Sequence, residues 1–370
     1  GAYALNQNTT GASNTAVGAN SLDANTTGER NTAVGLHALS ANTTGVSNTA
    51  VGNESLPKNT TGGDNVAVGD KAMYENTEGH DNTAVGREAL HLNTTGSENA
   101  AVGYWALRAN TASNNAAFGF GALRANTSGS SNTGIGKVAL AANTTASNNT
   151  AVGQSALASN TTYSNNTAVG SNAAAATTAS NNTAIGSSAL ATNSTGGSNV
   201  AIGRNALTAN TTAGNNVAVG DLALSSNTTG EKNVAVGREA LEANTTASDN
   251  TAIGDSAMEA NTTGSVNTAV GKSALKVNTT GAENVAVGKD SLKACTTGGT
   301  NTGVGMEALR YATTAGNNAA FGKGALKNCT TGNDNTALGK SSAGAITTGH
   351  SNIYVGHSCN ASGASVDHEI

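Results

Sequence analysis

Five residues in the first half of the chain have side chains suited to holding a ligand. Tyr104 and Trp105 are adjacent, and Phe120 follows Tyr104 at the same spacing as Arg124 follows Arg108. Aromatic faces beside guanidinium groups suit sugar rings and acidic glycans. The alternative interpretation is a lateral packing patch beside an irregular turn, and the sequence leaves both open.

No other group of residues has a spacing typical of catalysis or of metal binding. Four carboxylates occupy the same position, the third, in different copies of a seventeen-residue repeat: Glu54, Glu88, Glu239 and Glu307. No second acid or base recurs at a fixed offset from them. Cys295, Cys329 and Cys359 form no C-x-x-C pair, and we interpret them as small buried hydrophobic residues. We therefore expect a protein that is not an enzyme, with no catalytic residue, no metal and no cofactor.

All these candidates lie on an internal repeat that fills the chain. A glycine recurs at every seventeenth position from Gly1 to Gly356, apart from two intervals that are shorter by one, which gives 22 glycines. Numbered from this glycine, the consensus is G-x-x-A-L-x-x-N-T-T-G-x-x-N-T-A-V. A period this short indicates one repeated backbone turn.

The repeat predicts an all-β fold. A unit of this length is too short for a strand–helix–strand motif and shows no helical periodicity. It suits one coil of a parallel β-solenoid (a β-roll), in which equivalent residues stack ~4.8 Å apart. We expect about 22 such coils in a single continuous domain over residues 1–370. The two shorter intervals predict irregular coils near residues 104–119 and 171–186, with local kinks.

Fixed residues at each phase predict their roles. The glycines at positions one and eleven suit bends with positive φ. Position-fourteen asparagines can hydrogen-bond along a structural ladder; the first are Asn14, Asn31, Asn48, Asn65, Asn82 and Asn99. Position eight is also Asn in most coils, and its replacements indicate an inward side chain; these are Cys295, Ala312, Cys329 and Ile346. Many of these asparagines match the N-glycosylation pattern, which leaves glycan attachment as the lesser alternative.

The phrase N-T-A-V predicts a strand that is covered on both faces. Four consecutive positions are constrained, and so are the Ala and Leu at positions four and five, whereas one buried face would constrain alternate residues. We assign the Val at position seventeen to the core and the Ala at position sixteen to contact with another chain. A homotrimer is the expected assembly. A monomeric solenoid with a thin core is the alternative.

Composition excludes two classes of partner. Charged residues make up 11% of the chain and the net charge is −5, which argues against binding nucleic acid. No apolar run is long enough to cross a bilayer, so membrane insertion is not expected.

The phrase NTAVGxxAL-x-x-NTTG, at residues 31–45, 82–96 and 267–281, resembles repeats of bacteriophage and virus fibre proteins and of large chlorovirus glycoproteins. Its core, TAVGxxAL, is similar to the head repeats of YadA-like trimeric autotransporter adhesins. This resemblance implies a left-handed, trimeric β-roll that binds host surfaces. The adhesin repeat is shorter than this one, so the likeness covers the strand and its bend. Residues 351–356 resemble a segment that precedes a chaperone module in tail fibres, and such a module is expected downstream.

Together these features predict an extracellular protein on a virion or cell surface. The expected role is the shaft or head of a phage tail fibre, viral spike or adhesin, with cell-surface glycans as possible ligands. A pure spacer or filament-forming protein is the alternative. Ice binding is a weaker one, because the adjacent Thr9 and Thr10 point in different directions.

Overall fold

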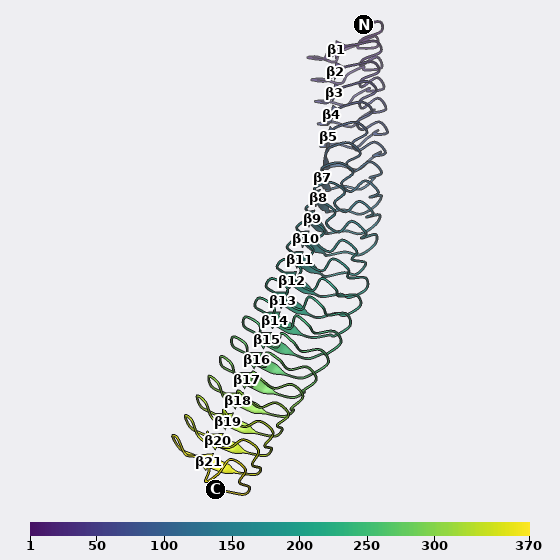
Figure 1. Cartoon of the computed structure of the whole chain (residues 1–370). Helices are drawn as coiled ribbons and strands as arrows, with labels where there is room; N and C mark the ends of the chain where they lie inside the picture. Colours follow the sequence, from purple (N-terminus) through teal and green to yellow (C-terminus); the bar gives the residue numbers. More distant parts are fainter. The chain divides into compact units, whose positions relative to one another are not determined.

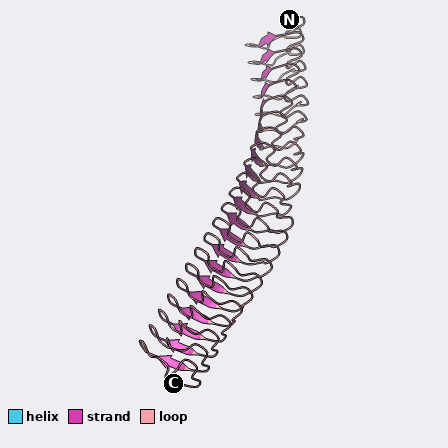
Figure 2. Cartoon of the chain, viewed as in Figure 1, coloured by secondary structure: helices cyan, strands magenta, loops and turns pink.

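The computed structural model describes residues 1–370 and contains strands but no helix. The chain forms two compact units, Gly1–Asn182 and Thr183–Ile370. Each unit is a parallel β-solenoid, in which every coil supplies one short strand and returns through turns (Figures 1 and 2). The predicted parallel solenoid with a seventeen-residue repeat is therefore confirmed. The prediction of one continuous domain over 1–370 stays a prediction.

The strands recur once per coil in both units. Those of the first unit are β1 (Thr15–Val17), β2 (Thr32–Val34), β3 (Thr49–Val51), β4 (Val66–Val68), β5 (Thr83–Val85), β6 (Ala100–Val102), β7 (Ala116–Phe118), β8 (Thr133–Ile135), β9 (Thr150–Val152) and β10 (Thr167–Val169). Those of the second unit are β11 (Thr183–Ile185), β12 (Val200–Ile202), β13 (Val217–Val219), β14 (Val234–Val236), β15 (Thr251–Ile253), β16 (Thr268–Val270), β17 (Val285–Val287), β18 (Thr302–Val304), β19 (Ala319–Phe321), β20 (Thr336–Leu338) and β21 (Ile353–Val355).

Neighbouring coils are in register, residue on equivalent residue. Ala33 pairs with Ala50 in the first unit, and Ala201 pairs with Ala218 in the second. The shortened coil after Gly103 keeps this register, since Ala101 pairs with Ala117. The missing residue is therefore absorbed in the turn and leaves the sheet intact.

Glycine is fixed at position one and frequent at position eleven, for different reasons. At position one, Gly69 has φ +133°, and a Cβ there would lie 2.7 Å from the carbonyl carbon of Gly86 in the next coil. The predicted positive φ is wrong for position eleven, where Gly45 is outside the left-handed region. A Cβ on Gly45 would instead lie 2.4 Å from the carbonyl oxygen of Gly62 in the next coil. Position eleven thus favours a small residue because the coils approach closely there.

Leucines at position five adopt a left-handed backbone that the sequence did not predict. Leu39 has φ 53°, and it is fully buried together with Ala38. In a strand, two neighbouring side chains would point to opposite faces. The turn at Leu39 lets both point inward, so the constraint on this pair does not indicate a second chain. Positive φ in a branched residue is costly and needs tertiary contacts to hold it.

The strand residues point the opposite way from our prediction. Ala33 and its counterparts at position sixteen are buried in the core, whereas the position-seventeen residues face outward. Only alternate residues of a strand can enter the coil. The assignment of Ala to an intermolecular contact and of Val to the core is therefore wrong: the Ala lies in the core and the position-seventeen residue faces outward.

Position-fourteen asparagines join successive coils through their side chains. Asn65 Oδ1 accepts the backbone N–H of Asn82 at 3.0 Å, and Asn65 Nδ2 donates to the carbonyl of Gly79 at 2.8 Å. The same two bonds are made by Asn14, Asn31, Asn48, Asn82 and Asn99, the last of these to the carbonyl of Ala112. Each side chain thus satisfies buried backbone groups that have no place in the strand ladder.

Position-eight asparagines form a second ladder, whose side chains hydrogen-bond fewer backbone groups than those at position fourteen. Asn59 Nδ2 donates to Asn42 Oδ1 at 2.9 Å and to the carbonyl of Gly62 at 2.8 Å. No backbone N–H is bonded to this side chain, and the Gly62 carbonyl also receives Asn48 Nδ2. Replacement therefore leaves no orphaned backbone group, and the inward orientation of Cys295 and the other substitutes is confirmed by their burial.

Candidate functional site

The predicted aromatic residues come together on the surface of the first unit. Tyr104 and Trp105 follow strand β6, and Phe120 lies in the same turn one coil on. The Tyr104 ring stacks on Trp105 at a centroid distance of 4.5 Å and on Phe120 at 5.5 Å. Trp105 has φ 62° and is half-buried. We call these three residues the aromatic patch.

A carboxylate one coil before Trp105, that of Glu88, organises the polar edge of the aromatic patch. Glu88 Oε2 accepts a hydrogen bond from Trp105 Nε1 at 3.0 Å and another from Arg108 Nε at 2.8 Å. The guanidinium carbon of Arg108 lies 5.8 Å from the Trp105 ring centroid, and that of Arg87 lies 5.8 Å from the Tyr104 ring. The only signal in the sequence for this role of Glu88 is its position, since it precedes Trp105 by one coil at the same position of the repeat.

The fifth predicted residue lies apart from this network. The Arg124 side chain is exposed and makes no hydrogen bond or ion pair. Arg108 and Arg124 share a phase, but only Arg108 is paired with an acid, Glu88. The patch therefore offers a cluster of three neighbouring aromatic rings, one fixed guanidinium and one free one. It can stack a ring and donate to acceptor oxygens.

The Glu88 network predicts a fluorescence change at acid pH. The hydrogen bond from Arg108 lowers the pKa of Glu88 below its ordinary 4.5, and the bond from Trp105 acts in the same direction. A depressed folded-state pKa stabilises the fold above the ordinary value, and this contribution is lost as the pH falls through the lowered pKa. Trp105 is the only Trp, so its emission should shift below pH 4.5. Glu88→Gln should abolish the transition, and an unchanged transition would contradict the assignment.

The outward face of each strand forms a second candidate surface. Positions fifteen and seventeen of β1–β21 carry Thr, Val, Ala, Ile, Phe or Leu, and no charged residue in any strand. We call these positions the strand outer face of each unit. Twelve of its position-seventeen residues are 36% to 65% exposed, among them Ile135, Ile202 and Leu338. A file of exposed apolar side chains of this regularity is typical of an interaction surface.

The cysteines divide into two kinds. Cys295 and Cys329 are buried, and burial raises the pKa of both thiols to about 11. Cys359 is exposed, so its interpretation as a buried hydrophobic residue is wrong. No three His, Cys, Asp or Glu side chains converge in a way that could hold a metal ion. Nor does the chain form any helix with the length and hydrophobicity of a membrane crossing.

Comparison with known proteins adds no assignment to these surfaces. No family model matches the chain, and the search of curated proteins returns no match either.

Proposed function

We propose that this chain is the shaft or head of an extracellular fibre, in a phage tail fibre, viral spike or surface adhesin, and that it acts without catalysis. The observation that carries the proposal is the strand outer face, which has no charged residue in any coil. Positions nine and ten are also uniform and face outward, but they carry polar Thr, whereas positions two and three vary and include charges, such as Arg87 and Glu54. The uniform apolar face serves for assembly, and the variable phases face the surroundings.

The assembly we propose is a homotrimer of left-handed solenoids, as the resemblance to YadA-like heads implies. Closed rotational symmetry lets each copy bury the same face against its neighbours. Light scattering tests this directly, because a trimer has three times the 36.0 kDa mass of the single chain. A mass of 36.0 kDa at micromolar concentration would contradict self-association.

Attachment to cell-surface glycans through the aromatic patch is the second part of the proposal. Its support is the stacked Tyr104, Trp105 and Phe120 with Arg108 fixed beside them. Carbohydrate rings bind to such faces through their apolar C–H groups, while the guanidinium donates to oxygens. Many weak contacts along a multimeric fibre would add through avidity.

Trp105→Ala should reduce binding to a glycan array about tenfold or more, since stacked aromatic anchors carry most of such an interface. The matched control is Tyr3→Ala, an exposed aromatic residue at the same position three with φ 60°. Unchanged glycan binding by Trp105→Ala would favour the alternative, a spacer or filament-forming protein whose aromatic patch serves only packing.

Ice binding receives less support than either role. The threonine hydroxyls at position nine are engaged between coils, as when Thr26 Oγ1 donates to the carbonyl of Thr43 at 3.0 Å. Thr43 Oγ1 bonds to Thr60 in the same way. Hydroxyls held in this way are not free donors for an ice lattice. A thermal-hysteresis measurement that finds none would remove this alternative.

A further inference from the structure

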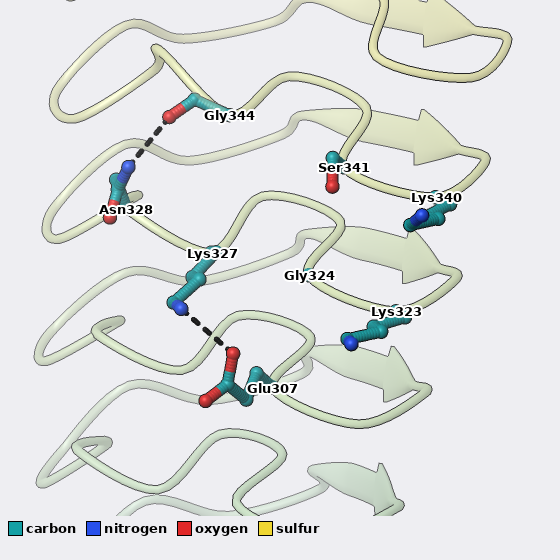
Figure 3. Close-up of a pocket in the computed structure, with 8 residues that line it drawn as sticks. All are labelled: Glu307, Lys323, Gly324, Lys327, Asn328, Lys340, Ser341 and Gly344. Carbon is teal, nitrogen blue, oxygen red and sulfur yellow. Dashed lines mark hydrogen bonds and ion pairs between the residues drawn. The ribbon is translucent and has the colours of Figure 1, made fainter.

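A hollow of about 450 Å³ opens on the second unit, over three successive coils (Figure 3). Its lining includes Lys323, Lys327, Lys340, Asn328, Ser341 and Glu307. All these residues belong to the turn that follows strands β18, β19 and β20. The hollow is therefore built from outward phases of the repeat, far along the chain from the aromatic patch.

Two glycines create the hollow by omitting side chains. Gly324 occupies position three, where the coils before and after have Glu307 and Ser341. Its φ is +67°, and a Cβ built there would meet nothing closer than Ser341 Oγ at 3.8 Å. Gly344 occupies position six, where the preceding coil has Lys327. The space left by these two side chains is what the lysines surround.

Lys323 and Lys340 belong to the half of the position-two cations that form no ion pair, together with Lys137 and Lys289. A position-two cation pairs with an acid at the same phase one coil away in several coils: Arg87 with Asp70, Arg204 with Asp221, and Arg238 and Lys272 with Asp255. Lys323 and Lys340 instead occupy position two in adjacent coils, and neither is ion-paired. Like charges at directly opposite positions of neighbouring chain segments repel one another. An anion between them would remove this repulsion.

The one acid in the lining cannot neutralise these lysines. Glu307 Oε2 accepts from Lys327 Nζ at 2.7 Å, and its other oxygen contacts Arg310. The bond from Lys327 lowers the pKa of Glu307, so the carboxylate stays charged and committed to that pair.

The excess of positive charge extends over the neighbouring coils. In the coils that begin at Gly288, Gly305, Gly322 and Gly339, positions two to six hold six cations and two acids. The cations are Lys289, Lys293, Arg310, Lys323, Lys327 and Lys340, and the acids are Asp290 and Glu307. This net +4 stands out on a chain whose net charge is −5.

We propose that the hollow binds an anionic group carried by a sugar, either a carboxylate or a sulfate ester. Lys323 and Lys340 provide the charge, and the Ser341 hydroxyl provides a neutral donor beside them (Figure 3). A sugar fits better than nucleic acid, because no aromatic side chain lines the hollow for base stacking and the whole chain is acidic. This inference deepens the proposed attachment to surface glycans and rests on it.

Calorimetric titration of the full chain tests the site with three probes: an oligogalacturonate for carboxylate, a dextran sulfate oligosaccharide for sulfate, and a neutral dextran oligosaccharide. We expect the acidic probes to bind and the neutral one not to. Lys323→Gln/Lys340→Gln should weaken binding about tenfold or more, because charge-assisted bonds are lost. Lys137→Gln, which removes an exposed position-two lysine in the first unit, should leave affinity unchanged.

Binding of neither acidic probe, equal binding of the neutral one, or unchanged affinity in the double variant would overturn the site. Tighter binding of duplex DNA than of either saccharide would overturn its assignment to sugars. Glycan-array binding that is lost in Trp105→Ala but kept in the lysine variant would leave surface attachment standing without this hollow. Probe binding at the hollow with no retention on any glycan surface would support the site and contradict the attachment.

Discussion

Asn65→Ala is expected to destabilise the surrounding coils by about 2–4 kcal/mol. The substitution removes Asn65 Oδ1, which accepts the buried backbone N–H of Asn82 at 3.0 Å. It also removes the amide that donates to Asn48 Oδ1 at 3.1 Å. An orphaned buried N–H costs about 1–3 kcal/mol, and the lost volume adds a cavity term. Hydrogen exchange of the Asn82 amide should rise accordingly.

Asn59→Ala is the matched control for this prediction, because it removes a buried Asn from the position-eight ladder. Its cost should be about 1 kcal/mol, since no backbone N–H bonds to it and the Gly62 carbonyl keeps Asn48 Nδ2. Position eight already holds Cys295 and Ala312 in other coils. Local exchange is the right readout, because repeat proteins open coil by coil. Equal costs for both variants would show that the ladders are interchangeable.

Ile202→Lys/Ile253→Lys should convert the proposed trimer to monomers while leaving the solenoid folded. Both side chains lie on the strand outer face of the second unit, with 36% and 40% exposure. In a monomer the new ammonium groups would remain in water. In an interface they would be buried without partners, at a cost of several kcal/mol each. Light scattering should find the mass reduced to one third, which is the 36.0 kDa of a single chain.

Ser187→Lys/Thr212→Lys adds the same charge at exposed residues outside the strands of the second unit. We expect this control to keep the mass of the wild type. Circular dichroism of both variants should match the wild type, because none of the four residues enters the core. If the isoleucine variant stayed trimeric, another face would carry the assembly, and a control that dissociates would mean that added charge alone is responsible.

The sequence by itself determined the solenoid and its register. Stacked identical amides are useful only when they recur at one phase, so the Asn at position fourteen implied equivalent residues in adjacent coils. Asn65 between Asn48 and Asn82 is that arrangement in the structure. The replacements at position eight likewise indicated an inward side chain, since Cys295 and Ile346 suit burial. These inferences required only the repeat pattern, because each residue is packed against the equivalent residues of the coils before and after it.

The interpretation of the aromatic patch depended on the tertiary structure. The repeat pattern alone predicted that Tyr104 and Phe120 are neighbours, because they occupy the same position in successive coils. It could not identify Glu88 as the partner of Arg108 and Trp105, since three long side chains must turn toward one another. The hollow at Lys323 was hidden for a related reason. It depends on the side chains that Gly324 and Gly344 lack, and the sequence does not show how much space a missing side chain leaves.

Which strand residues face inward was decided only by the tertiary structure. A strand such as Thr32–Val34 offers either Ala33 alone or its two neighbours to the core, and constraint at all three positions is compatible with both. The turn that follows the strand makes the choice, through Gly35 with φ 142° and Leu39 with φ 53°. The sequence favours no positive φ at Leu, because the conformation is stable only when the coils above and below hold it. The residue preferences of each segment therefore determined the repeat, whereas contacts between coils determined which side chains face the core and which face outward.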